Sequence, residues 1–311
     1  MISLEKGKRI TSHIINQPFI QRELLKWEIY SLKDVDYWFL HRGFEQQGFN
    51  SGAFLKIAGK NMIDANCAIK KEGKELINNL GFLLEDSNYN KYEREFFANI
   101  DGPFYTSLKN NEKGETGKNF YKSVKEFLDK PNIGKSNMWK LIFWMMNSCR
   151  YLNEEYENSF KNFLFEEFGK SLNKKISLEN VNNLYYTDWK IIEENKPWLK
   201  IYGIGEETFS FILRDAMEIS FKDYLIKHDS TNIKFFHRTG LDRLAEPNLI
   251  DERDKYLDVM QKIKGKYSLR EINIAIFLYC SKTFNKKPFC SNIENCNDCG
   301  IQNICLQDFS K

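Results

Sequence analysis

Apolar residues recur at helical spacing along the second half of the chain. Residues 138–152 (MWKLIFWMMNSCRYL) form a strongly apolar helical pattern that begins after Ser136 and Asn137, and residues 153–169 continue it. Further helix-bearing segments cover residues 201–215, 251–264 and 269–282. The connections between these segments have ordinary lengths. The pattern therefore predicts that the second half of the chain is all α.

The first 90 residues show no such regularity. Aromatic residues such as Trp38 and Phe44 are mixed with Gly43 and Gly48 in a way that fits neither a helical nor a strand period. We therefore expect a compact N-terminal region, rich in aromatic residues and of uncertain structure.

A polar stretch follows this region. Within residues 86–135, Gly114, Gly117 and the neighbouring Asn and Lys residues predict a surface loop. Pro131 and Gly134 punctuate its end and suggest a domain boundary. The chain is accordingly divided into three predicted segments, which are residues 1–134, 135–240 and 241–311.

Composition narrows the class of protein. The 311 residues are 42% hydrophobic and 15% aromatic, which is enough for a sizeable core. The charge is only +3, from 46 basic and 43 acidic residues, so contact with nucleic acid would need a local basic surface. The first residues lack the apolar core of a signal peptide, and no long uncharged apolar stretch follows. We expect a cytoplasmic protein without a membrane role.

Four of the seven cysteines lie in the last 22 residues. They follow the pattern Cys290-x5-Cys296-x2-Cys299-x5-Cys305. In a reducing cytoplasm such thiols remain available for metal, and thiolates suit either an iron–sulfur cluster or zinc. Structural zinc usually uses two CxxC-like pairs, whereas only the central pair here is two apart, so a cluster is favoured and zinc is the alternative.

The cysteine pattern resembles the cluster loop of helix-hairpin-helix DNA glycosylases, in the branch of endonuclease III and the adenine glycosylases. In that family the gaps are six, two and five residues, so the first gap here is one residue short, and Cys280 is a substitute to consider for Cys290. The resemblance implies a [4Fe–4S] cluster on Cys290, Cys296, Cys299 and Cys305.

A second stretch, LKIYGIGEETFSFIL at residues 199–213, resembles the hairpin motif of the same family. Gly203, Ile204 and Gly205 match its G-V-G core. The two glycines would let the backbone approach a DNA phosphate, which the amides at the start of the next helix would bind. Bifunctional members place their Schiff-base lysine where this chain has Glu207, so the resemblance implies a monofunctional enzyme.

The segment that begins at His228 and Asp229 resembles the family's V-D-T-H-x-x-R-x-x-x-R segment. By this resemblance Asp229 is the catalytic carboxylate, which would stabilise an oxocarbenium-like sugar and help to position the attacking water. An Asp before a helix is also a good N-cap, and the two roles are compatible.

Family members flip their target base out of the duplex and fill the gap with a side chain from a loop after a barrel helix. On the resemblance, residues 139–150 are that helix and loop, and Arg150 takes the wedge position. A surface arginine at a helix end is the alternative interpretation. The resemblance covers roughly residues 135–311, and residues 1–134 are an extension that could recognise the substrate.

The expectations are therefore as follows. The fold is mainly α, a helix-hairpin-helix glycosylase fold of two helical lobes, with the helical barrel in residues 135–240 and the cluster loop in residues 241–311. The function is hydrolysis of the N-glycosidic bond of a damaged or modified base in double-stranded DNA, as in base excision repair, by a monomer that joins the nucleoid when it acts. The alternatives are a catalytically silent DNA-binding protein and a glycosylase/lyase that uses another lysine.

Overall fold

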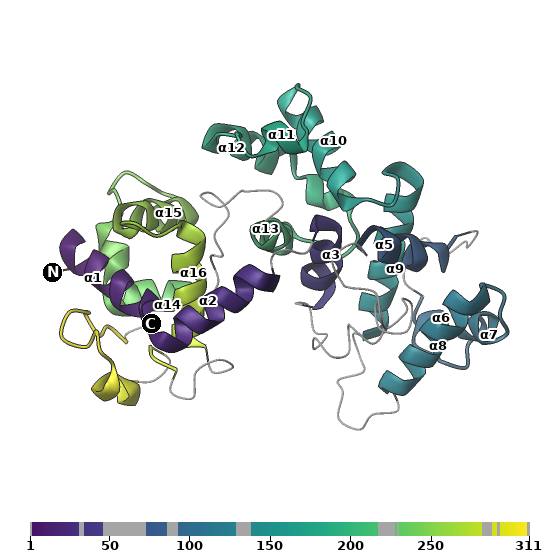
Figure 1. Ribbon diagram of the computed structural model, residues 1–311, viewed down its shortest axis with the longest axis horizontal. Helices are drawn as coiled ribbons and strands as arrows, with labels where there is room; N and C mark the ends of the chain where they lie inside the picture. Colours follow the sequence, from purple (N-terminus) through teal and green to yellow (C-terminus); the bar gives the residue numbers. More distant parts are fainter. Residues whose placement is uncertain are drawn as a thin grey trace. The chain divides into compact units, whose positions relative to one another are not determined.

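The computed structural model describes residues 2–30, 34–45, 73–85, 93–128, 138–216, 228, 230–281, 288–290 and 293–309. Every regular element within these ranges is a helix, which confirms the mainly α prediction (Figure 1). None of the described helices combines the length and the apolar character that a membrane crossing requires.

The chain forms two compact units. We call Met1–Ser31 together with Phe221–Lys311 the terminal unit, and Leu32–Ser220 the central unit. This division differs from the three consecutive segments that the sequence suggested, because the first helices pack with the C-terminal helices. Each unit is described by itself.

The terminal unit contains five α-helices and two short 3-10 helices within its described residues. They are α1 (Leu4–Ile15), α2 (Pro18–Tyr30), α14 (Ser230–Thr239), η4 (Leu241–Leu244), α15 (Glu252–Ile263), α16 (Leu269–Cys280) and η5 (Ile293–Asp298). Helix α16 contacts α1, α2, α14 and α15. A helix that is apolar around its whole circumference belongs in a core, and α16 is buried along almost its entire length.

The start of α16 is fixed by a capping box. Ser268 Oγ accepts a hydrogen bond from the backbone amide of Glu271 at 3.2 Å, and Glu271 Oε2 accepts one from the amide of Ser268 at 2.7 Å. Two amides that the helix cannot satisfy are thereby paired. The apolar face of α1, with Ile10 and Ile14, joins the same core as α16.

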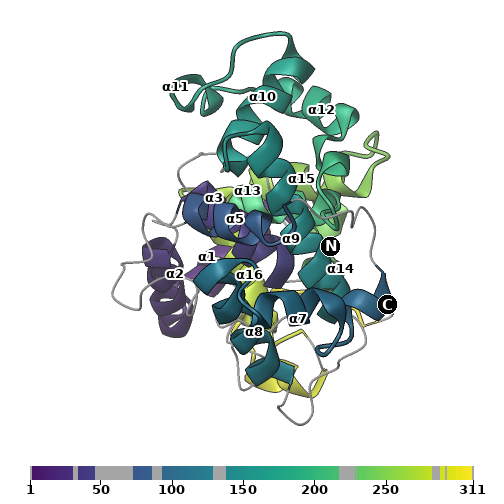
Figure 2. The same cartoon turned by 90° about the vertical axis from the view of Figure 1, so that its right-hand side faces the viewer.

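The central unit holds the remaining helices. They are α3 (Val35–Leu40), η1 (His41–Glu45, a π-helix turn), α5 (Gly73–Phe82), α6 (Arg94–Phe97), α7 (Pro103–Lys109), α8 (Gly114–Leu128), α9 (Met138–Glu155), α10 (Phe160–Leu172), α11 (Leu178–Val181), α12 (Tyr186–Asn195), η3 (Pro197–Lys200) and α13 (Glu206–Asp215). Helices α3, α5 and α9 lie side by side (Figure 2). Phe39 and Phe160 stack in this core with ring centroids 4.4 Å apart.

The predicted helical segments contain α9, α10, α13, α15 and α16. The predicted loop around Gly114 and Gly117 was wrong, because both glycines belong to the 15-residue helix α8. Phe120 and Val124 lie one turn apart on this helix and are fully buried. Their burial outweighs the low helix propensity of Gly117, which costs about 1 kcal/mol in a helix interior, whereas Gly114 only begins the helix.

Candidate functional site

Residues 288–290 pack against the end of α16. The amide of Phe289 donates a hydrogen bond to the carbonyl of Tyr279 at 3.2 Å, and the two rings stack with centroids 4.6 Å apart. This contact brings Cys290 beside Cys280, the last residue of α16, and their thiols hydrogen-bond to each other. Cys290 has a left-handed backbone, with φ of 59°.

The other three cysteines of the motif lie close enough to Cys290 for its charge to raise the pKa of each. Cys296 is buried in η5, and the Cys299 Sγ lies 3.1 Å from the Tyr279 hydroxyl. The amide of Cys305 donates to the carbonyl of Ile301 at 3.0 Å, which closes the last turn of the loop. The predicted cysteines are therefore brought together.

Electrostatic coupling shows how close these thiols lie. Burial raises the pKa of Cys280, Cys296, Cys299 and Cys305, the last to about 11, and charge on Cys290 raises each of them further. The hydrogen bond from Cys280 instead lowers the pKa of Cys290. All five thiols, including Cys280, thus share one environment.

A guanidinium stands beside the thiols. Arg238, in the last turn of α14, lies over the ring of Phe309 at 4.7 Å; its charge adds to the lowering of the Cys290 pKa and partly offsets the rise of the Cys280 and Cys296 pKa values. Its Nε is buried and has no hydrogen-bond partner within the described part of the chain. Because a hydrogen bond from Cys280 and the charge of Arg238 both favour its thiolate form, Cys290 is the thiol whose pKa is lowered.

Thiolates are soft ligands that suit an anionic metal group such as an iron–sulfur cluster. Such a group would also accept a hydrogen bond from the buried Nε of Arg238, which otherwise lacks a partner among the described residues. In their described positions, however, no three His, Cys, Asp or Glu side chains are arranged to hold a single metal ion.

The predicted hairpin is a tight turn between η3 and α13. Gly203 has φ of +71°, and a Cβ on it would lie 2.4 Å from the ring of Trp144, so only glycine fits. Ser148 Oγ donates to the carbonyl of Tyr202 at 3.1 Å and ties the turn to α9. Ile204 is buried at the centre of the turn.

Gly205 is the N-cap of α13 and no side chain caps it. Apart from its chain neighbours, no atom of the described residues lies within 4 Å of the position that its Cβ would take, so a side chain at this position would meet open space. Glu206 and Glu207 follow in the first helical turn and are exposed. They interact favourably with the helix dipole, and they also reduce the positive potential that a phosphate would meet.

Asp229, the predicted catalytic residue, lies outside the described residues, but its neighbours His228 and Ser230 are described. A pocket of about 150 Å³ opens beside them and is lined by His228, Ile233, Lys234, Phe236, His237, Asp242, Glu252, Lys255, Tyr256 and Val259. The rings of Phe236 and His228 lie 4.2 Å and 5.2 Å from that of Tyr256. This pocket was not found from the sequence.

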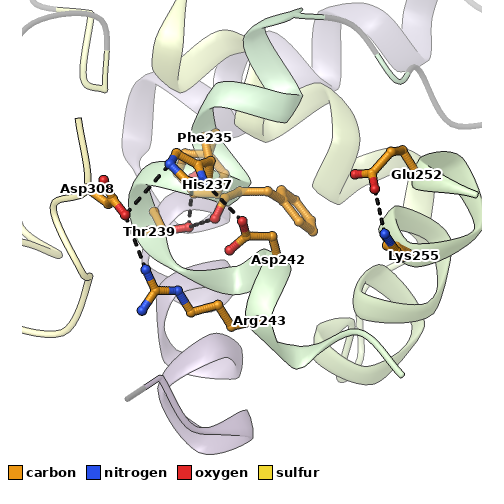
Figure 3. Close-up of polar contacts among 9 residues, drawn as sticks. Phe235, His237, Thr239, Asp242, Arg243, Glu252, Lys255 and Asp308 are labelled. Carbon is orange, nitrogen blue, oxygen red and sulfur yellow. Dashed lines mark hydrogen bonds and ion pairs between the residues drawn. The ribbon is translucent and has the colours of Figure 1, made fainter. Parts of the chain in front are cut away.

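One wall of this pocket is a histidine between two carboxylates (Figure 3). His237 Nδ1 lies 3.1 Å from Asp242 Oδ2, and its Nε2 lies 3.7 Å from Asp308 Oδ2. Arg243 binds the same Asp308 oxygen at 3.2 Å. The amide of Asp308 also donates to the carbonyl of Arg238 at 3.0 Å. Asp308, which follows the last cysteine of the motif, is thereby hydrogen-bonded to α14.

Arg150 does not occupy the position that the sequence suggested. Helix α9 continues to Glu155, so Arg150 lies inside the helix and not in a loop beyond its end. Its side chain is 13% exposed, and it donates a hydrogen bond to the carbonyl of Leu84 at 3.4 Å and lies 3.9 Å from Glu154. Helix α9 extends five residues beyond Arg150, whereas the wedge hypothesis required a loop there.

The cysteines and the residues beside Asp229 belong to the terminal unit, whereas the hairpin and Arg150 belong to the central unit. No protein-family model, no curated protein and no solved structure matches the chain.

Proposed function

We propose that this protein is a DNA glycosylase that hydrolyses the bond between the sugar and a damaged or modified base in double-stranded DNA. The observation that carries the proposal is the gathering of the spaced thiols around Tyr279 and beside Arg238. Those thiols lie in the same unit as the residues that flank Asp229. The turn at Gly203 and Gly205 adds a second element of the sequence resemblance.

The proposed cofactor is a [4Fe–4S] cluster on Cys290, Cys296, Cys299 and Cys305. Its support is the donor set, which consists of soft thiolates, and the buried Nε of Arg238 that lacks a partner among the described residues. When bound, the cluster supplies structure and no chemistry to the reaction. The contacts of residues 306 and 308 with the last turn of α14 would extend that order to the helix that begins after Asp229.

The proposed reaction uses Asp229 as its essential carboxylate. As the bond from the sugar carbon to the base breaks, positive charge develops on the sugar, and a nearby carboxylate stabilises it. Water adds its hydroxyl to that carbon, and its remaining proton leaves with the base or to solvent. The DNA strand keeps both phosphodiester bonds, and an abasic site remains.

Glu207 limits the proposed chemistry. A lyase cuts the strand after a lysine amine forms an imine with the sugar, and a carboxylate cannot form that bond. Glu207 is exposed in the first turn of α13, where a longer side chain has room. Glu207→Lys is therefore expected to give a covalent adduct with substrate DNA that borohydride traps, while the wild type gives none.

The test is release of free base from duplexes that carry a panel of modified bases. Wild type is expected to release at least one base and Asp229→Asn none, whereas Asp101→Asn, an exposed carboxylate of the central unit, serves as the matched control. Full activity of the Asp229→Asn variant would refute the assignment of that residue. Tight DNA binding with no base released from any duplex would instead identify a catalytically silent DNA-binding protein.

A further inference from the structure

A second pocket in the terminal unit, of about 490 Å³, lies where α1 meets the cysteine loop. It is lined by Arg9, Ser12, His13, Asn16, Gln17, Gly300 and Ile304. None of these residues is acidic, and every polar side chain among them can donate a hydrogen bond. The chemistry of the lining therefore selects an anion.

Two of the donors are unused. The Arg9 guanidinium forms no ion pair or hydrogen bond with any described residue. The backbone amide of Gly300 likewise has no hydrogen-bond partner among the described residues. Gly300 follows Cys299 directly, so the loop that carries the thiols also supplies one wall of the pocket. A guanidinium and a backbone amide are groups that commonly bind phosphate oxygens.

The remaining donors are held in place. A Cβ on Gly300 would lie 2.4 Å from both Cε1 and Nε2 of His13, so the glycine lets the imidazole pack directly on the loop backbone. Gln17 Nε2 lies 2.9 Å from His13 Nε2 and donates to the His13 carbonyl at 3.2 Å. Asn16 is fixed by the hydroxyl of Tyr267 at 3.3 Å. Little conformational entropy is lost when a ligand binds to side chains that are already ordered.

We propose that this pocket binds a phosphate group through Arg9, His13 and the amide of Gly300. Two kinds of ligand carry such a phosphate group, namely the DNA backbone and a free phosphoryl compound. The DNA source rests on the proposed function, whereas binding of phosphate itself does not.

Two measurements on the full-length protein test the proposal, each with wild type, Arg9→Ala and Lys8→Ala. Lys8 is an exposed cation on the same helix that does not line the pocket, so it is the matched control. The first follows the ring resonances of His13, one of four histidines, during titration with inorganic phosphate at constant ionic strength. The His13→Gln variant assigns the signal, and circular dichroism verifies the fold of every variant.

The second measures the affinity for a labelled duplex at a series of salt concentrations. Loss of one phosphate contact lowers the slope of log affinity against log salt by about 0.9. We expect phosphate to shift the His13 signal in wild type and Lys8→Ala but not in Arg9→Ala, and the salt slope to fall only in Arg9→Ala.

The outcomes separate the sources. A phosphate-dependent shift that Arg9→Ala removes, with an unchanged salt slope, supports the pocket and assigns it to a free phosphoryl compound. The same shift in a protein that binds no DNA supports the pocket while it removes the glycosylase proposal. An absent shift together with equal salt slopes for Arg9→Ala and Lys8→Ala would overturn the inference.

Discussion

Asp36 is a buried carboxylate at the point where α3 meets the start of α10. Both of its oxygens accept from the Ser159 hydroxyl at 3.2 Å, and Oδ1 also accepts from the amide of Lys161 at 2.9 Å. Ser159 is the N-cap of α10, so Asp36 completes that cap from a neighbouring helix. Burial nevertheless raises the pKa of Asp36 to about 6, and repulsion from Asp34 adds to the rise.

This raised pKa makes stability depend on pH in a defined direction. The ordinary value is 3.8, and the value in the folded protein is about 6. Between these two values the folded protein holds a proton that the unfolded chain has lost, so stability falls as pH rises through this window. At 1.36 kcal/mol per unit the difference amounts to roughly 3 kcal/mol, fully developed near pH 7.

The Asp36→Asn substitution removes this ionisation and keeps an acceptor for the Lys161 amide. Relative to wild type, the unfolding free energy of the variant should therefore rise by roughly 2 kcal/mol between pH 4 and pH 7. A loss of stability that is the same at every pH, such as a weaker hydrogen bond to Ser159, does not affect this pH-dependent change.

Urea unfolding followed by tryptophan fluorescence suits this test, because five of the six tryptophans lie in the central unit with Asp36. Asp101→Asn, at an exposed carboxylate of the same unit, is the control and should track wild type at every pH. A difference that is independent of pH, or that moves in favour of wild type as pH rises, would refute the reasoning.

Two further predictions follow from single positions. Gly203→Ala should lower the melting temperature in differential scanning calorimetry, because the left-handed backbone costs about 1–2 kcal/mol and the new methyl group meets Trp144; Gly205→Ala, which meets nothing, is the control. An equal effect of the two would contradict the hairpin geometry. Cys290→Ser should lose most of its bound iron and Cys280→Ser should retain it; the reverse pattern would identify Cys280 as the ligand.

The helices that could be predicted from the sequence are those with long apolar repeats. Helices α9 and α16 are apolar over several turns, and such a repeat needs no tertiary information to be recognised. Helix α8 was missed because Gly114 and Gly117 have the composition of a loop. Its helical state depends on burial of Phe120 and Val124, which only the folded chain provides.

The candidate site, too, has features that the sequence could predict and features that it could not. The cysteine spacing is local information and could be recognised, whereas the pairing of Cys280 with Cys290 depends on the backbone contact between Phe289 and Tyr279. The pocket where α1 meets the cysteine loop joins residues that are far apart in the sequence, such as Arg9 and Gly300. No periodicity or motif brings such residues together.

The most direct measurement of the central claim is the metal and sulfide content of the purified full-length protein, taken with its visible absorption spectrum. The central claim is that Cys290, Cys296, Cys299 and Cys305 hold an iron–sulfur cluster in a glycosylase scaffold. We expect a brown protein with about four iron and four acid-labile sulfide per chain, as the [4Fe–4S] composition requires. A colourless protein with stoichiometric zinc, or with neither metal, would contradict it.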